Sequence, residues 1–157
     1  MPTAILDSNL LVLLAVGSLD RSLIQEHKRT SQFTEEDFDL LLTLLNAFDE
    51  VLVTPNGLTE TSNLLQYAKQ HRRAQLLAVL AALSGQLTEE YIPSRDVAAS
   101  PVFTRLGLAD AAIVAGFSES WVLTDDLDLY LHLASLGRKA INFNHYRLGS
   151  WGLADLT

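Results

Sequence analysis

The stretch Ala4-Ile-Leu-Asp-Ser-Asn-Leu-Leu-Val-Leu-Leu14 decides the fold, because it joins a short apolar run to a helix-like run through one carboxylate, Asp7. A buried strand favours Val, Ile and Leu, and an ionised Asp at its end is costly unless something pairs with it. In an open parallel sheet, ligands bind beyond the carboxyl ends of the strands. Asp7 is therefore predicted to lie where such a fold carries out its chemistry.

The composition predicts one domain over residues 1–157. A chain of 157 residues can bury a core without disulfides. The absence of cysteine excludes thiolate zinc sites and cysteine nucleophiles, and it agrees with a reducing compartment. No apolar run approaches the roughly 18 residues of a membrane span, and no basic region precedes the first apolar run. We therefore expect a cytoplasmic protein with no membrane span.

The formal net charge of -8 counts against a protein that coats nucleic acid through a generally basic surface. It does not count against clustered acids that bind a metal. The basic residues fall in local groups, each of which is by itself more typical of a solvated helix face: Lys28-Arg29, Lys69 with Arg72-Arg73, and Arg138-Lys139. The hydrophobic fraction of 48% indicates that some apolar helix surface is kept for a partner.

Short apolar runs alternate with helical patterns along the chain. Gly17 is expected to close the first helix. The alternation, with short connections, predicts an α/β fold whose parallel sheet is covered on both faces. The expected strands are residues 4–6, 51–54, 90–92, 121–124 and 139–143, and the expected helices are 10–17, 19–24, 34–48, 56–68, 71–83, 94–106 with an interruption at Pro101, 108–115 and 127–137.

Acidic residues recur at the predicted ends of these strands. Carboxylates that converge on one sheet edge raise one another's pKa, unless divalent cations lie between them. Oxygen ligands without His or Cys suit Mg²⁺ and Mn²⁺, and two such ions can hold the attacking water and the leaving oxygen of phosphodiester hydrolysis. The acids concerned are Asp7, Glu60, Asp110, Asp125, Asp126 and Asp128.

Each acid also has a simpler explanation. Asp125 or Asp126 alone is better explained as the cap of the helix that ends near Gly137. Glu60 on a helix could face solvent, as most Glu residues do. Asp110 is harder to explain in this way, because its neighbours are small and apolar. The combination favours a site, since independent caps need not appear at the ends of successive strands.

Five segments in order resemble the motif series of PIN-domain ribonucleases over nearly the whole chain. They are Ile5-Leu-Asp-Ser-Asn9, Val53-Thr-Pro55 with Glu60-Thr-Ser-Asn-Leu64, Gly107-Leu-Ala-Asp-Ala111, Val122-Leu-Thr-Asp-Asp-Leu-Asp128 and Ala140-Ile-Asn-Phe143. The resemblance implies a three-layer α/β/α fold with a central parallel sheet of order 3-2-1-4-5. It also implies an endoribonuclease dependent on Mg²⁺ or Mn²⁺, most often the toxin of a VapBC-type toxin–antitoxin pair, with an antitoxin partner and a homodimeric state.

The resemblance assigns roles residue by residue. Asp7, Glu60 and Asp110 match the family's acids directly, and the fourth acid matches Asp126, with Asp125 as a near alternative. Two further residues match supporting roles: Thr124 matches a hydroxyl that helps to hold water or metal, and Asn9 matches a residue that orients the first Asp. Without the resemblance, Thr124 is simply a strand-end residue and Asn9 a helix first-turn residue.

Rival functions fit the sequence less well. No two of His27, His71, His132 and His145 share a helical i, i+4 spacing or lie near a nucleophile motif. A phosphate-receiver domain needs paired acids after the first strand, where this chain has Asp7-Ser8, and a dehalogenase-type phosphatase needs a second Asp where it has Asn9.

The alternative from another class is a non-catalytic PIN-like module that binds metal or protein. Two departures from the family pattern leave room for it: extra length between Gly17 and Glu50, and an acidic balance unusual for binding RNA unaided. The complete set of acids speaks against it.

Overall fold

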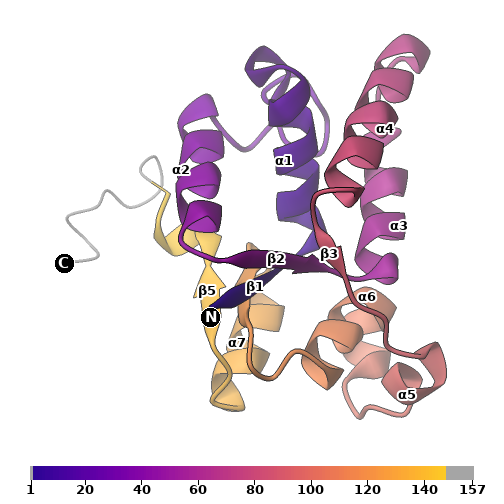
Figure 1. The fold of residues 1–157 in the computed structure, drawn as a ribbon, viewed down its shortest axis with the longest axis vertical. Helices are drawn as coiled ribbons and strands as arrows, with labels where there is room; N and C mark the ends of the chain where they lie inside the picture. The colour runs from indigo at the N-terminus through magenta and orange to yellow at the C-terminus, as the bar shows by residue number, and fades with distance from the viewer. Residues whose placement is uncertain (1, 148–157) are drawn as a thin grey trace.

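The structure is a computed structural model that describes residues 2–147. Its five strands form one all-parallel sheet of order β3-β2-β1-β4-β5 (Figure 1). This confirms the α/β class and the strand order 3-2-1-4-5. The strands are β1 (Thr3–Leu6), β2 (Glu50–Val53), β3 (Thr88–Glu89), β4 (Trp121–Thr124) and β5 (Ala140–Asn142).

Helices cover both faces of the sheet, which makes the three-layer α/β/α architecture (Figure 1). Successive strand residues point to opposite faces. Ala4 and Leu6 of β1 accordingly join one apolar core, while Ile5 between them joins the other. One layer contains α1 (Ser8–Leu19), α2 (Glu35–Asn46), α3 (Pro55–Leu65) and α4 (Gln70–Ser84), and the other contains α5 (Ser94–Ala98), α6 (Phe103–Ala115) and α7 (Leu127–Ser135).

Helix α1 is the centre of the larger core. Every residue from Leu10 to Gly17 is buried. The helix is in contact with α2, α3, α4 and β4. A helix that is apolar on all sides is stable only when it is surrounded in this way. Asp7, at the start of α1, is therefore fixed to the most rigidly packed element of the fold.

Two helix starts follow the signals in the sequence. Thr34 accepts a hydrogen bond from the backbone of Asp37, whose carboxylate bonds back to the Thr34 backbone, so a capping box opens α2. Thr54 caps α3 through the backbone N–H of Gly57, and Pro55 occupies the first helical position. The second of these caps fixes how α3, which carries Glu60, leaves β2.

The first helix does not end at Gly17 as predicted but continues to Leu19. Gly17 instead allows α1 and α2 to pack closely, because a Cβ atom at position 17 would lie 2.2 Å from Cδ1 of Phe38 on α2. The expected helix over residues 19–24 is also wrong: Asp20 is extended and caps a single 3₁₀ turn, η1 (Arg21–Leu23).

The third strand forms earlier than predicted. It contains Thr88 and Glu89, which pair with Leu52 and Val53, and not residues 90–92. Glu90 still donates its N–H to the Val53 carbonyl at 2.9 Å. Pairing stops there because β2 ends at Val53 and the chain turns into α3. No helix within residues 2–147 is long and apolar enough to cross a membrane.

Candidate active site

Asp7 and Thr124 stand side by side at the carboxyl ends of two neighbouring strands. The pairing of Leu6 with Leu123 places the residues that follow them next to each other. Thr124 donates its hydroxyl to Asp7 Oδ2 at 2.6 Å, and the Ser8 N–H donates to Asp7 Oδ1 at 2.7 Å. Only 4% of Asp7 and none of Thr124 is exposed. The carboxylate is thus held through both oxygens in a buried position.

The environment of Asp7 disfavours its ionised form. Burial, the largest cause, and the negative charges of Asp125 and Glu60 together raise the pKa of Asp7 to about 6, against the hydrogen bonds from Thr124 and Ser8 that lower it. The neighbouring acids thus add a surplus of negative charge to the effect of burial. That surplus is what a divalent cation would neutralise.

Glu60 reaches this cluster from α3, and Ser8 connects it to Asp7. The Ser8 hydroxyl donates to Glu60 Oε1 and also lies 3.5 Å from Asp7 Oδ1. No sequence motif assigns this role to Ser8. The available signal was its position directly after Asp7 on the first turn of α1, from which its hydroxyl can reach the neighbouring helix.

Asp110 approaches from the opposite helical layer, on α6. Gly107 breaks that helix with φ 83° and ψ 174°, as predicted, and Asp110 follows it by less than one turn. Burial, the largest cause, and the charges of four other carboxylates together raise the pKa of Asp110 to about 8; the four are Asp7, Asp126, Glu60 and Asp125. The structure therefore brings five of the six predicted acids within electrostatic reach of one another, whereas Asp128 pairs with Arg105.

The two acids after β4 have different partners. Asp125 accepts a hydrogen bond from the Asn9 side chain at 3.3 Å, and burial raises its pKa. Asp126 Oδ1 caps α7 by accepting from the N–H groups of Asp128 at 2.9 Å and Leu129 at 3.3 Å. Capping accounts for one oxygen of Asp126 and leaves the other available, so both acids remain candidates for the fourth position.

Asn9 contacts a different acid from the one that the resemblance implies. Its amide bonds to Asp125, while Asp7 takes its orientation from Thr124 and Ser8. Thr124 also accepts the N–H of Asp126 at 3.0 Å. This buried hydroxyl links the acid after β1 to the acids after β4.

A second support for Asp125 comes from the end of the described chain. Asn144 donates its side-chain amide to the Asp125 carbonyl at 3.1 Å. Arg147 contacts Asn144 and pairs with Asp37 at 3.0 Å, and its positive charge lowers the pKa of Asp125 against the effect of burial. The sequence analysis missed this contribution, because no pattern connects residues 144–147 to the acids before the fold is known.

The donor chemistry of the site fits a hard divalent cation, since every acid side chain offers only oxygen. Among residues 2–147, however, no three His, Cys, Asp or Glu side chains form a preformed metal-binding group. The acids are near enough to shift one another's pKa values, but their side chains do not converge on a single point in the described residues. Beside Glu60 lies an open cavity of about 430 Å³, lined also by Asn56, Asn63 and Tyr91.

The histidines take positions away from these acids, as the sequence predicted for surface or core residues. His27 is buried against the Leu65 carbonyl, and His71 lines a different cavity at the start of α4. His132 contacts Arg105, and His145 packs its ring edge-on to Tyr130 with centroids 5.3 Å apart.

No protein-family model and no curated protein matches this chain. The interpretation of the site therefore rests on its own geometry and charge.

Proposed function

We propose that this protein is a metal-dependent endoribonuclease of the PIN type, which hydrolyses RNA phosphodiester bonds. The observation that carries the proposal is the meeting of Asp7, Glu60, Asp110 and the Asp125–Asp126 pair at one sheet edge, with the pKa of Asp7 and Asp110 raised. Several carboxylates that raise one another's pKa at the carboxyl ends of parallel strands are typical of a catalytic site. The strand order supports the same interpretation.

Asp7, Glu60 and Asp110, with Asp126 or Asp125, would hold one or two Mg²⁺ or Mn²⁺ ions. Such an ion supplies a water of lowered pKa and offsets the charge that develops on the phosphate. Thr124 and Ser8 keep the carboxylate of Asp7 in one orientation. The packing of α1 keeps that arrangement rigid, which is what preorganised charge stabilisation requires.

The RNA strand would lie in the open cavity beside Glu60. Asn56 and Asn63 line this cavity, and their side-chain amides can donate to and accept from base edges. Tyr91, also in the lining, is 72% exposed and offers a face on which a base can stack. Of the residues that the structure describes, no Lys or Arg lines this cavity, so the contacts available in it suit bases more than phosphates.

The biological setting that we propose is the cytoplasm, where the protein would act as the toxin of a toxin–antitoxin pair. An antitoxin or a second copy of the chain needs an apolar docking surface. Two leucines four residues apart on one side of α7 are more than half exposed and supply one: Leu127 and Leu131. A homodimer through this face, or an antitoxin bound to it, would bury them.

The experiment that tests the proposal compares metal binding with RNA cleavage on one preparation. Calorimetry with Mn²⁺ should show binding, and a 5′-labelled single-stranded RNA should be cut at internal positions in Mn²⁺ and remain intact in EDTA. If the protein bound Mn²⁺ but left every RNA intact, the nuclease proposal would be contradicted, and the result would support the alternative, a non-catalytic metal-binding module.

A further inference from the structure

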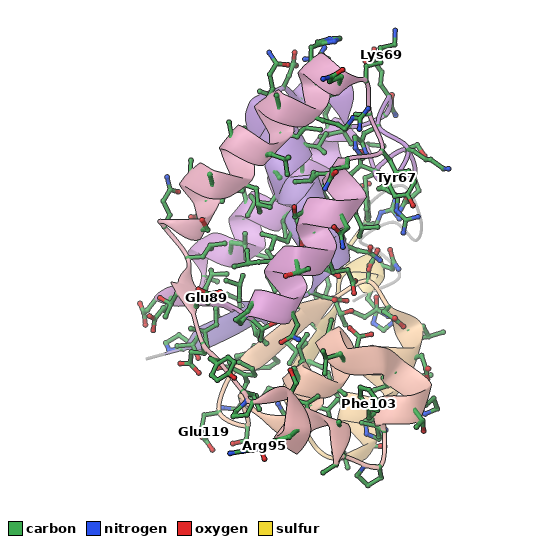
Figure 2. All side chains as sticks on the ribbon, turned by 90° about the vertical axis from the view of Figure 1, so that its right-hand side faces the viewer. Tyr67, Lys69, Glu89, Arg95, Phe103 and Glu119 are labelled. Atoms are coloured by element: carbon green, nitrogen blue, oxygen red, sulfur yellow. The ribbon has the colours of Figure 1, made fainter. Side chains whose placement is uncertain are left out.

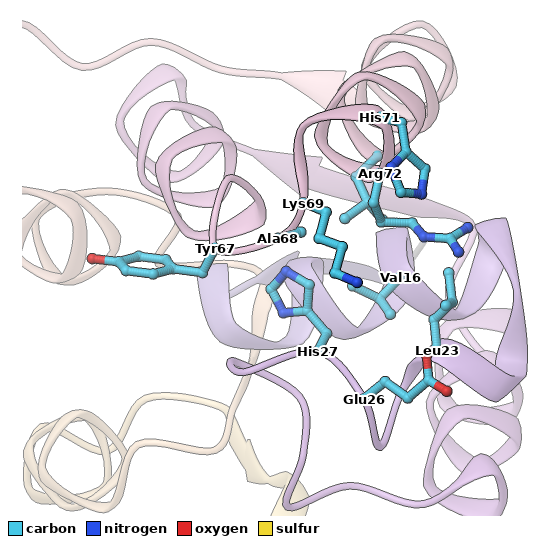
Figure 3. Close-up of a pocket in the computed structure, with 10 residues that line it drawn as sticks. Val16, Leu23, Glu26, His27, Tyr67, Ala68, Lys69, His71 and Arg72 are labelled. Carbon is cyan, nitrogen blue, oxygen red and sulfur yellow. The ribbon is translucent and has the colours of Figure 1, made fainter.

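A second cavity, of about 410 Å³, opens where the loop after η1 meets the start of α4 (Figure 3). Its floor is apolar and comes from Val16 and Leu76, together with Leu23 and Ala68. Its walls carry Lys69, His71 and Arg72, and Glu26 is the one carboxylate in the lining. Figure 3 shows Lys69 and Arg72 reaching into this space from the start of α4. The cavity thus has a positive wall in a chain of net charge -8.

These cations are only partly neutralised by the protein itself: the charge of Arg72 helps to lower the pKa of Asp20, and Glu26 lines the same cavity. Within residues 2–147, neither Lys69 nor Arg72 forms an ion pair, and Arg72 bonds only to the neutral Gln75 side chain, at 3.0 Å. Tyr67 also lines the cavity, but its ring points away from Lys69 and Arg72 (Figure 3), and Lys28 and Arg29 lie near that ring, with Lys28 Nζ 5.1 Å and Arg29 Cζ 5.9 Å from its centroid. The positive wall of the cavity therefore comes from the start of α4.

The local helix chemistry adds to the positive field. Lys69 is the N-cap residue of α4, and it makes no side-chain cap hydrogen bond. The first turn contains no acid, although the helix dipole favours acids there, and it carries His71, Arg72 and Arg73 instead. This arrangement costs stability in the free protein, and an anion in the cavity would remove the cost.

His27 gives the cavity a fixed edge. It is 6% exposed, accepts the Arg29 N–H at 3.1 Å through Nδ1, and places Nε2 3.4 Å from the Leu65 carbonyl at the end of α3. This geometry makes Nε2 the protonated nitrogen, and burial lowers the pKa of His27, so the ring is a neutral anchor. The anchor ties the basic loop to the same helix that carries Glu60.

We propose that this cavity, walled by Lys69 and Arg72, binds a phosphate group. Cationic side chains and N–H groups at a helix start suit a phosphate, and a recess of about 410 Å³ suits a compact anion better than an extended acidic peptide. The phosphate can belong to the RNA backbone or to a free phosphate ester. The first source rests on the proposed nuclease function.

The RNA source agrees with the location of the cavity. Leu65, which contacts His27, lies about 7 Å along the axis of α3 from Glu60 at 1.5 Å rise per residue. An RNA strand that passes the acids could thus reach the basic cavity within a few nucleotides. Figure 2 places Tyr67 and Lys69 at one end of the molecule and Arg95 and Phe103 at the other, so Arg95 is too remote to take part.

The test combines a charge-neutral double variant, Lys69→Gln with Arg72→Gln, with a matched control, Arg73→Gln. Arg73 lies on the same turn of α4 but is exposed and does not line the cavity. We expect inorganic phosphate, titrated by NMR on the Gln70 and His71 amides, to bind the double variant at least tenfold more weakly than wild type. The control should bind phosphate as wild type does. Thermal unfolding checks that each variant is folded. If the double variant does not fold, the single variant Lys69→Gln is used in its place.

A second arm identifies the source of the phosphate. A short single-stranded RNA is titrated in EDTA, where no cleavage occurs, and the double variant should reduce the slope of log affinity against log salt by about 1.4, the value for two lost contacts at 0.7 each. An unchanged slope would overturn the RNA source. The proposed site would be overturned if wild type and the double variant bound phosphate equally well. It would also be overturned if Arg73→Gln weakened phosphate binding as much as the double variant does, or if the cavity bound polyglutamate in place of phosphate. Failure of RNA cleavage with phosphate binding intact would remove only the proposed nuclease function.

Discussion

Thr124 at the end of β4 donates its hydroxyl to the carboxylate of Asp7 at the end of β1, over 2.6 Å, and the same hydroxyl accepts the N–H of Asp126. This single buried group connects the two strand ends from which the candidate site is built. It also lowers the pKa of Asp7 against the effect of burial. The function of the site should therefore depend on this hydroxyl.

Replacing Thr124 by Val keeps the shape of the side chain but removes its hydroxyl. Asp7 then loses its strongest side-chain donor, so its pKa should rise further, and the buried carboxylate oxygen left without a partner should cost about 1 to 3 kcal/mol of stability. We expect the acidic limb of the pH–rate profile for RNA cleavage to move to higher pH. Thr124→Ser, which retains the hydroxyl, should restore the wild-type profile. An unchanged profile in Thr124→Val would show that this hydrogen bond does not act on the site.

The metal-free protein should become less stable as the pH rises from about 6 to about 9. Asp110 has a folded-state pKa of about 8 and an unfolded-state value of 3.8, so the folded state binds more protons in this range. The free energy of unfolding then falls with increasing pH, at up to about 1.4 kcal/mol per pH unit while the folded group is still protonated and the unfolded group is already charged, and it levels off above the folded-state pKa of about 8. The melting temperature in EDTA measures this effect.

The control for that pH dependence is Asp110→Asn, which keeps the shape and cannot ionise. Its melting temperature should be higher than that of wild type at pH 9 and should vary less between pH 6 and 9. Saturating Mn²⁺ should remove most of the difference for wild type at high pH, because a bound cation offsets the repulsion between the acids. A wild-type melting temperature that rises with pH in EDTA would contradict this electrostatic interpretation.

The two acids after β4 can be separated by substitution. Asp126 caps α7, so Asp126→Ala should lose about 1 kcal/mol of stability, while Asp126→Asn keeps a capping oxygen and should lose little. Asp125 caps no helix in the described part of the chain, and its side chain accepts a hydrogen bond from Asn9. We expect Asp125→Asn to weaken Mn²⁺ binding, measured by calorimetry, more than Asp126→Asn does. The reverse order would identify Asp126 as the fourth acid.

The close packing of Gly17 against Phe38 makes a prediction about the fold alone. A Cβ atom at position 17 would lie 2.2 Å from the Phe38 ring, so Gly17→Ala should destabilise the protein by about 1 to 3 kcal/mol in urea unfolding. Shortening the opposing side chain with Phe38→Leu should make the Gly17→Ala change less costly. Gly85→Ala is the matched control, because the nearest atom to its Cβ is 3.4 Å away, and it should have almost no effect.

The parts of the fold that could be predicted are those that local chemistry decides. Asp7, Thr124 and Gly107 each lie at a boundary that the sequence marks: a strand end, a strand end and a helix break. The parts that could not be predicted depend on contacts between distant segments. Gly17 has the local signal of a helix end, and only the approach of Phe38 explains its position inside α1. The early end of β3 depends likewise on where β2 stops.

The candidate site follows the same division. The acids could be predicted because they recur at the ends of successive strands, whereas the hydrogen bonds among them could not. Ser8 bridges to Glu60, 52 positions away, and Asn9 bonds to Asp125, 116 positions away. Arg138 shows how a basic group can mislead: it belongs to a predicted basic surface group, but its guanidinium binds the carbonyls of Val114 and Gly116 at the end of α6. Its role is to close a helix, and it is not available to RNA.

The most direct test of the central claim is the rate at which the purified protein cleaves single-stranded RNA in Mn²⁺, compared between wild type, Asp7→Asn and the control Asp49→Asn. Asp49 carries the same charge but is exposed beyond the other end of the sheet, where its N–H bonds to the Pro2 carbonyl. Our account predicts that Asp7→Asn lowers the rate at least a hundredfold with its fold intact, and that Asp49→Asn leaves the rate unchanged. Equal cleavage by wild type and Asp7→Asn would contradict it.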